Sequence, residues 1–229
     1  MKLHTEKEYH LANMMAVHRL RNLYRVSESI FYNIIEHIPA YIHLNNTNHD
    51  IVFANNNLKK RSRELDNLAE YGSHYLEKIS CPILLDSLKQ KTSRFIKNND
   101  DDEICSYFQR VLIDEQMTYV YSHKMHLDES KHLVFSNILT ELGSMGKVFL
   151  GIIEQYFTNK TSWQRFFSLT KQEKEIVRLI SKGYTYKQIS DTLFISSHTV
   201  RVHRKNIYKK LDINNTTGLV KIAMLLDII

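Results

Sequence analysis

Three helix starts follow one another closely in the last third of the sequence. Thr170 precedes Glu173 by three residues, and Thr185 precedes Gln188 by the same spacing. This is the capping-box pattern, in which a hydroxyl and a longer side chain each bond to the other residue's backbone N–H. Ser196 offers an N-cap for a third helix soon afterwards. The pattern predicts short helices joined by tight turns, with a helix-turn-helix at its centre.

The helix that follows Ser196 is predicted over Ser197–Leu211. Projected at about 100° per residue, it separates into two faces. The inward face carries Val200, His203, Ile207 and Leu211. The opposite face carries His198, Arg201, Val202, Lys205 and Lys209. The cations therefore gather where no apolar core competes for them.

Charge supports a polyanionic partner for this region. No acidic residue occurs between Ser196 and Leu211, whereas an ordinary solvated helix mixes signs to form i,i+4 pairs. Residues 163–229 hold twelve Lys and Arg against five Asp and Glu, and the remaining residues hold nineteen against twenty. A basic module attached to a nearly neutral one is typical of nucleic-acid binding.

The segment LTKQEKEIVRLISKGYTYKQISDTLFISSHTVRVHRKNIYKKLDI, residues 169–213, resembles the DNA-binding domain of LuxR/FixJ-type regulators, an all-α four-helix module. The resemblance implies that Ser197–Leu211 is the recognition helix. It implies base contacts by Arg201, Val202 and Lys205. It implies phosphate contacts by Thr185, Lys187, Thr199, Asn206 and Lys209. Two positions depart from the family: Gln172 replaces a usual Arg, and Thr216 with Thr217 replaces an Arg-Thr pair.

The last helix, predicted over residues 217–229, carries more apolar surface than one face needs. In the family this helix forms the dimer contact. The resemblance therefore implies dimerisation through Leu219, Ile222 and Leu226, and a C2 homodimer on a two-fold symmetric site in double-stranded DNA.

The first two thirds of the chain mix helices and strands. Apolar spacing predicts a helix over residues 7–25 and a second helix that Ser27 or Ser29 caps and that runs through Ile30 to Ile38. It predicts further helices over residues 55–68 and 83–95. Short apolar runs at 41–44 and 51–53 flank the turn-forming NNTNHD and predict a hairpin. Further strands are predicted over 104–113, 118–127 and 132–140, antiparallel because their connections are too short for crossovers.

This order resembles a PAS domain, whose opening is similar to IIEHIPAYIHLNNTNHDIVFANNNLKKRS, residues 34–62. The predicted fold class is an α+β PAS-like sensor domain, an antiparallel sheet with helices, followed by the four-helix LuxR-type domain. The predicted divisions are an N-terminal helix at 1–28, a PAS-like domain at 29–142, a linker helix at 143–162 and the DNA-binding domain at 163–229.

The sequence indicates neither an enzyme nor a particular cofactor. It contains no P-loop, G-x-S-x-G or H-E-x-x-H motif, and it lacks the acidic pattern of a phosphoreceiver. We expect His123, His126 and His132 to be surface histidines rather than metal ligands, so no metal site is predicted. The acidic run at 98–103 is predicted to be a solvated turn.

Two cysteines without CxxC spacing and no long apolar stretch predict a soluble cytoplasmic protein without a membrane anchor. The predicted function is a sequence-specific DNA-binding transcriptional regulator whose PAS-like domain senses a small-molecule or protein signal or mediates dimerisation. The alternative is a protein-interaction module that a basic helix-turn-helix tethers to DNA without regulating transcription. The sequence does not specify the ligand, the operator, or whether the regulator activates or represses transcription.

Overall fold

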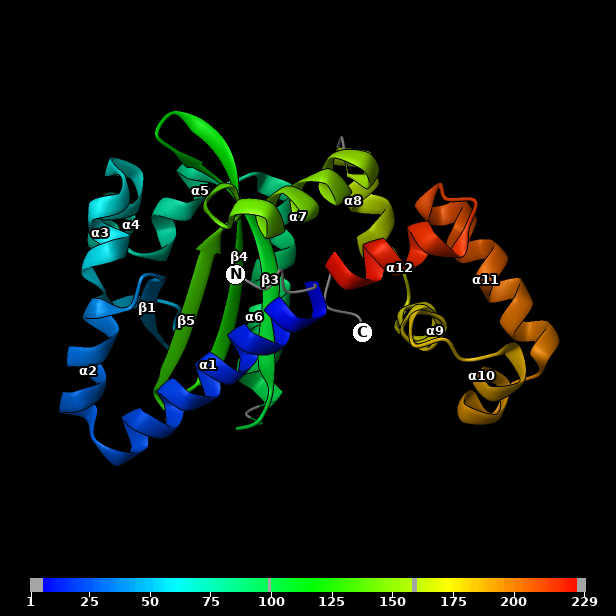
Figure 1. Ribbon diagram of the computed structural model, residues 1–229, viewed down its shortest axis with the longest axis horizontal. Helices are drawn as coiled ribbons and strands as arrows, with labels where there is room; N and C mark the ends of the chain where they lie inside the picture. The colour runs from blue at the N-terminus through cyan, green and yellow to red at the C-terminus, as the bar shows by residue number, and fades with distance from the viewer. Residues whose placement is uncertain (1–5, 99, 158–159, 226–229) are drawn as a thin grey trace. The chain divides into compact units, whose positions relative to one another are not determined.

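The computed structural model describes residues 6–98, 100–157 and 160–225 (Figure 1). Its chain forms two compact units, Met1–Lys147 and Val148–Ile229, which are described separately below. The finer four-part division of the sequence stays a prediction. No helix within the described ranges is long and apolar enough to cross a membrane.

Two helices and a hairpin open the first unit. Ser27 ends the first helix and caps the second, because its Oγ accepts a hydrogen bond from the Ile30 N–H at 3.4 Å. The elements are α1 (Glu6–Val26), α2 (Glu28–His37), β1 (Tyr41–Asn46) and β2 (Ile51–Ala54). The predicted hairpin is confirmed, with its strands antiparallel.

The single helix predicted over residues 55–68 is wrong, because the chain forms two helices there. Ser62 adopts an extended backbone, and its Oγ caps the second helix by accepting from the Leu65 N–H at 3.2 Å. A serine that can bond to its own backbone interrupts a helix that apolar spacing alone would continue. The helices between β2 and β3 are α3 (Asn56–Arg61), α4 (Arg63–Tyr71), the 3₁₀ turn η1 (Ser73–Tyr75), α5 (Leu76–Ile79) and α6 (Pro82–Asn98).

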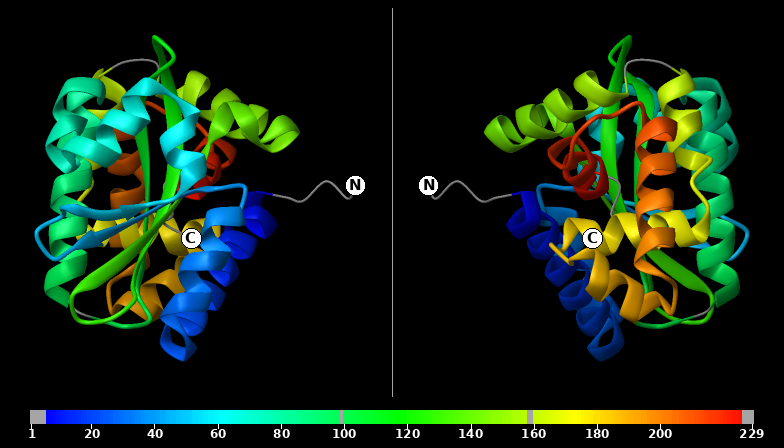
Figure 2. Two further views of the ribbon diagram at one scale, coloured as in Figure 1. Left: turned by 90° about the vertical axis from the view of Figure 1, so that its left-hand side faces the viewer. Right: turned by 90° about the vertical axis from the view of Figure 1, so that its right-hand side faces the viewer.

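Three long strands complete a five-stranded antiparallel sheet with the order β2-β1-β5-β4-β3. They are β3 (Ile104–Ile113), β4 (Gln116–His126) and β5 (Lys131–Ile138), followed by the 3₁₀ turn η2 (Leu139–Glu141). Figure 2 shows the β3–β4 hairpin in green, with α6 running beside it. The predicted α+β class of this unit, an antiparallel sheet with helices, is confirmed.

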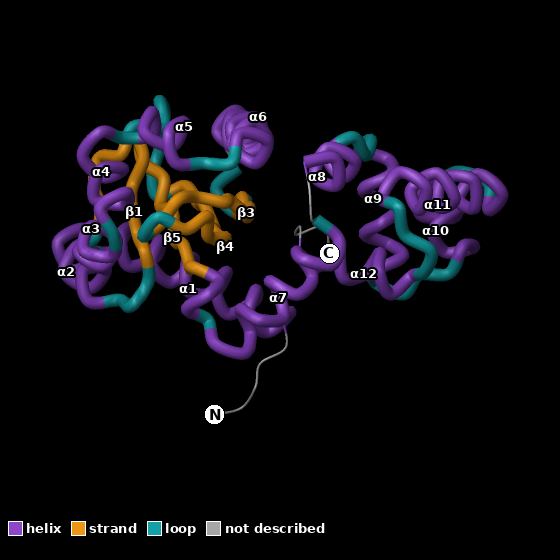
Figure 3. Tube along the Cα trace, turned by 90° about the horizontal axis from the view of Figure 1, so that it is seen from above, coloured by secondary structure: helices purple, strands orange, loops and turns teal. Residues whose placement is uncertain are grey.

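Helices cover both faces of this sheet (Figure 3). On one face, α1 and α2 pack an apolar core on the strands. Its largest fully buried members include Phe31, Ile35, Ile42, Leu44, Met125 and Leu133. On the other face, α3, α4 and α5 pack a second core around Val111, Val120 and Ile138. The stacking of Phe95 on His126 brings α6 onto this second face.

The expectation of surface histidines is wrong. His123, His126 and His132 are all at most 1% exposed. They lie on β4 and β5, which have a strand on either side and a helical layer over each face. Alternating polar residues predict an exposed strand face only when one face of the sheet is left to solvent.

Asn55 joins the hairpin to the helices of this unit. It is fully buried, and its Oδ1 accepts from the N–H groups of Ile42 and Leu58, each at 3.1 Å. Its Nδ2 donates to the carbonyls of Ile35 and Ala40, each at 3.0 Å. One amide thus holds α2, β1 and the start of α3 together.

The acidic run at 98–103 includes an exposed turn, and two of its carboxylates form ion pairs with arginines of α1. Asp102 lies 3.1 Å from Arg21, and Asp101 lies 2.7 Å from Arg25. These contacts tie the loop before β3 to the first helix.

The second unit is helical. Its elements are α7 (Gly143–Tyr156, beginning in the first unit), α8 (Lys160–Phe167), α9 (Lys171–Ser181), α10 (Tyr186–Leu193), α11 (Ser197–Leu211) and α12 (Thr216–Leu225). Its core includes Phe166, Leu169, Ile176, Val177, Leu179, Ile189, Val200 and Ile207, none more than 4% exposed. The predicted all-α class of this unit is confirmed.

Candidate nucleic-acid interface

Backbone caps place α10 and α11 at a defined turn. Thr185 and Gln188 form a complete capping box at the start of α10. Phe194 ends that helix in the left-handed conformation, with φ 54° and ψ 41°. Ser196 then accepts from the Thr199 N–H at 3.0 Å and begins α11. The helix boundaries therefore follow from local hydrogen bonds that the sequence already contains.

The inward face of α11 is anchored in the core of its unit. Val200 and Ile207 have no exposed surface, whereas His203 and Leu211 are half-buried. Their burial fixes the rotation of the helix about its own axis. As a result, the residues opposite them must face away from the core.

The face opposite the core is basic and exposed. Val202, between Arg201 and Lys205 on this surface, is 45% exposed. The exposed members of the set are His198, Arg201, Val202, Lys205, Asn206 and Lys209. The structure thus brings together on one helix the three residues predicted to contact bases.

The residues predicted to contact phosphate come from both helices and differ in their freedom to do so. Lys187 is exposed on α10. The hydroxyl of Thr185 donates to Gln188 Oε1 at 2.9 Å, and that of Thr199 lies 2.8 Å from Ser196 Oγ. A phosphate oxygen that received the Thr185 hydroxyl proton would replace the bond to Gln188 Oε1, and the cap itself, in which Thr185 accepts from the Gln188 N–H, would remain.

Arg204 is a residue of this surface that the helical projection did not assign to either face. Its guanidinium lies over the ring of Tyr208 at 4.7 Å and over the ring of Tyr186 at 5.6 Å. It also donates to the hydroxyls of Tyr186, Tyr208 and Thr216. The i,i+4 spacing of Arg204 and Tyr208 in one helix was a usable signal, but Tyr186 comes from α10.

Tyr186 also contacts a predicted base-reading residue. The guanidinium of Arg201 lies 5.6 Å from the centroid of the Tyr186 ring. One aromatic side chain therefore lies beside two arginines of the next helix. A cation held against a ring face loses less conformational freedom when it later binds.

Lys210 is a second residue that the helical projection did not assign to either face. It lies 2.7 Å from the carboxylate of Glu173, the N3 residue of the α9 capping box. Burial by itself would raise the pKa of Glu173, but the hydrogen bonds from Lys210 and from the Thr170 N–H outweigh it and leave the pKa lowered. Lys210 thus joins α11 to α9 rather than facing outward with Lys209.

Two of the three residues predicted to form the dimer contact are buried inside the unit. Leu219 and Ile222 are buried, at 0% and 2% exposure, within their own unit. These two side chains contribute to the core of that unit, and Leu226 lies outside the described residues. Dimerisation through this helix therefore stays a prediction.

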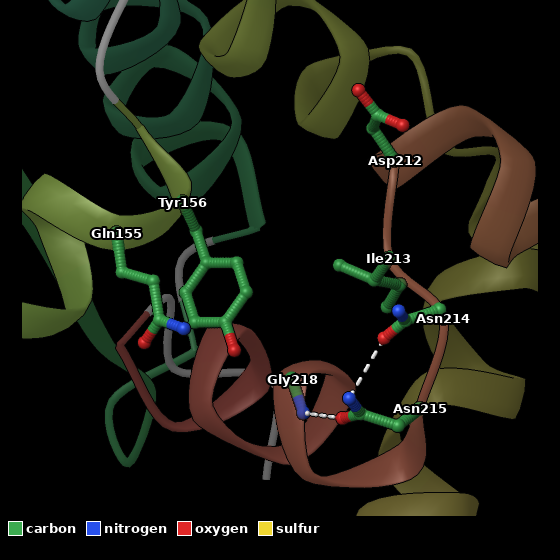
Figure 4. A pocket seen from close by; sticks show the side chains of 7 residues that line it. All are labelled: Gln155, Tyr156, Asp212, Ile213, Asn214, Asn215 and Gly218. Atoms are coloured by element: carbon green, nitrogen blue, oxygen red, sulfur yellow. Dashed lines mark hydrogen bonds between the residues drawn. The ribbon is translucent and has the colours of Figure 1, made fainter.

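A small polar pocket lies beside the start of α12 (Figure 4). Asn215 shapes it, since its Oδ1 accepts from the Gly218 N–H and its Nδ2 donates to Asn214 Oδ1, both at 2.8 Å. A Cβ on Gly218 would lie 3.0 Å from the Tyr156 hydroxyl, so the glycine permits this close approach. The amides and the tyrosine hydroxyl carry no catalytic arrangement.

The described residues were also compared with the arrangement that a metal ion requires. No group of three or more His, Cys, Asp or Glu within them is placed to hold a metal ion. Neither Cys81 nor Cys105 forms a disulfide.

Comparison with known proteins assigns the helical unit. Residues 167–223 match the family model "Bacterial regulatory proteins, luxR family". The transcriptional regulatory protein MctR of Rhizobium johnstonii is 46% identical over 56 residues, which are 24% of this chain and 26% of MctR. The transcriptional regulatory protein LiaR of Bacillus subtilis is 50% identical over 50 residues, which are 22% of this chain and 24% of LiaR. The chain thus spans about a quarter of the length of these curated relatives.

A solved structure, a phage VqmA–DPO complex, aligns over 86% of this chain and 87% of that one. Its sequence identity is 14% and its TM-score is 0.37. The family assignment therefore rests on the C-terminal residues, where capping boxes, core positions and the basic helix coincide with the matched segment. The C-terminal part of this chain is a helix-turn-helix domain of the LuxR family.

Proposed function

We propose that the chain is a sequence-specific DNA-binding transcriptional regulator that acts in the cytoplasm as a homodimer. Its PAS-like unit senses a small-molecule or protein signal or mediates dimerisation. The observation that supports this best is the exposed, acid-free face of α11, where Arg201, Val202 and Lys205 lie together.

The chemistry of that face suits the DNA major groove, which admits a helix. Arg201 can bridge O6 and N7 of a guanine, and Val202 can contact a thymine methyl group. Lys205 adds a further donor, whereas Lys209 and Asn206 are placed for backbone phosphates. Tyr186 would hold Arg201 and Arg204 in position.

The first test compares Arg201→Ala with Lys209→Ala on an operator selected from random duplexes. Arg201→Ala should relax discrimination at about one base pair by ~1–3 kcal/mol, because a bidentate base contact is lost. Lys209→Ala should weaken binding to all sequences and make the slope of log K against log salt shallower by about 0.9, since one phosphate contact is lost.

Competition binding at several salt concentrations measures both quantities. An equal loss on every sequence for Arg201→Ala would contradict its role in base reading. Footprinting separates the main proposal from the tether alternative, because a tether would protect no defined operator.

A dimer has its own test. Leu219 and Ile222 are core residues, so substituting them would unfold the unit rather than report on association. Leu226→Asp is the informative variant, compared by analytical ultracentrifugation with and without operator DNA. An unchanged dimer would exclude Leu226 from the contact.

A further inference from the structure

Arg204 joins three helices of the C-terminal unit. Its guanidinium donates hydrogen bonds to the hydroxyl of Tyr186 on α10 and, at 2.9 Å, to that of Tyr208 on its own helix. It also donates at 3.0 Å to the hydroxyl of Thr216, the first residue of α12. The hydroxyl oxygens of Tyr208 and Thr216 lie 3.0 Å apart, so two of the acceptors are themselves connected.

The same guanidinium packs against two aromatic rings. Its Cζ lies 4.7 Å from the centroid of the Tyr208 ring and 5.6 Å from that of the Tyr186 ring. The hydrogen bond to Tyr208 is the largest cause that raises the pKa of Arg204, so the group stays charged. Hydrogen bonds from a charged donor are stronger than those between neutral groups. Three such bonds and two rings therefore hold the side chain in one conformation.

This environment separates Arg204 from the cations predicted to bind DNA. Arg201, Lys205 and Lys209 are exposed, whereas Arg204 is half-buried. Its three bonds use both terminal nitrogens of the guanidinium. These nitrogens form the planar fork with which an arginine bridges a guanine or a phosphate. The fork of Arg204 is thus engaged inside the protein.

Tyr186 carries this constraint to a predicted base-reading residue. Its hydroxyl is held by Arg204, and its ring centroid lies 5.6 Å from Arg201 Cζ. Arg201 and Arg204 are three residues apart on α11, so they are neighbours on the helix surface and their like charges repel. Because Arg204 occupies the hydroxyl, Arg201 keeps the ring contact in an exposed position.

We propose that Arg204 is a positioning residue: it does not contact DNA, and it fixes the Tyr186 ring so that Arg201 meets its base pair in one geometry. The proposal rests on the proposed function in taking Arg201 as a base-reading residue. A side chain that is restricted before binding loses less conformational entropy on binding. By this route Thr216, which lies outside α11, also affects the base pair that Arg201 reads.

The experiment measures binding of the 229-residue chain to its selected operator and to duplexes changed at the base pair that Arg201→Ala identifies. Arg204→Lys keeps the positive charge but lacks the planar fork that reaches three hydroxyls. It should lower discrimination at that base pair by about three- to tenfold, the effect of freeing one long side chain. Discrimination at other base pairs and the slope of log K against log salt should keep the parent values.

Two variants test the contact from the other helices. Tyr186→Leu removes the ring and should lower discrimination as much as Arg204→Lys does. Thr216→Val removes one acceptor on α12 and should lower it by about twofold. Tyr184→Leu, at a tyrosine that is 42% exposed, is the matched control and should keep the parent discrimination. In the Arg201→Ala background, Tyr186→Leu should cause no further loss at that base pair.

Parent-level discrimination in Arg204→Lys, or an added loss from Tyr186→Leu in the Arg201→Ala background, overturns the proposal. A uniform loss of affinity with a shallower salt slope in Arg204→Gln also overturns it, because that result identifies a phosphate contact. Discrimination is a ratio of affinities, so partial unfolding of a variant does not change it. Failure of the proposed function appears in the parent chain and in Arg201→Ala, whereas failure of this proposal appears only in the variants of Arg204, Tyr186 and Thr216.

Discussion

In the N-terminal unit several polar side chains are buried between the helices and the sheet. In the C-terminal unit the polar side chains that cap helices or form the basic face are exposed. Asn55 and Lys124 are at most 2% exposed, but Thr185 and Lys205 face solvent. A buried polar group must find each partner inside the protein, and its loss is expensive. An exposed one exchanges its partners with water and remains available to a ligand that arrives later.

The exposed environment of the C-terminal unit suits its proposed partner. A polyanion such as DNA engages many exposed cations at once, each contributing modestly and in a salt-dependent way. The two units thus use the same side-chain chemistry in opposite environments.

The largest expected effect tests the buried side of this comparison. Asn55→Ala removes four hydrogen bonds and leaves four buried backbone groups unsatisfied. We expect the free energy of unfolding of the N-terminal unit to fall by about 3 kcal/mol or more. Urea unfolding followed by segment-resolved hydrogen exchange measures each unit separately. The control Asn56→Ala alters an exposed neighbour, and its free energy of unfolding should stay within about 0.5 kcal/mol of the parent value. An equally small effect of Asn55→Ala would contradict the contrast between buried and exposed polar side chains.

An intermediate effect is expected for the buried carboxylate of the α9 capping box, Glu173. Glu173→Gln breaks the pair with Lys210 and should lower the stability of the C-terminal unit by about 1–2 kcal/mol at neutral pH. Because the folded pKa of Glu173 is lowered, its contribution is complete above the unfolded value of about 4.3. That contribution is lost as the pH falls through the folded pKa.

Hydrogen exchange of α9 and α11 against pH measures this loss. The parent chain should lose stability in that acidic window, and the Gln variant should lose less there. Asp191→Asn, at an exposed position of α10, is the control and should follow the parent chain. Parallel curves for the parent and Glu173→Gln would show that the carboxylate does not stabilise the folded unit.

The smallest effect concerns the exposed N-cap of α10. Thr185→Ala removes the hydroxyl that accepts from the Gln188 N–H and should cost about 1 kcal/mol in the C-terminal unit. Thr185→Ser keeps the oxygen and should recover most of the loss. Thermal unfolding ranks the three chains, and an Ala variant as stable as the parent would mean that water replaces the cap.

Much of the C-terminal unit could be predicted because its determinants are local. Capping boxes join residues three apart, and apolar spacing sets which face of α11 is buried, so Arg201, Val202 and Lys205 were placed on the outer face without a structure. The contacts of Arg204 with Tyr186 and of Lys210 with Glu173 could not be predicted in this way. Each joins different helices, and nothing in the local pattern specifies their separation.

The N-terminal unit shows the opposite balance. The sequence by itself determined the order of strands and helices, since periodicity and turn residues act over a few positions. The tertiary structure alone decided that His126, His132 and Lys124 share one buried face. That outcome depends on which strands become central and which helices cover them, and pairings between distant strands are settled by the packing of the whole unit.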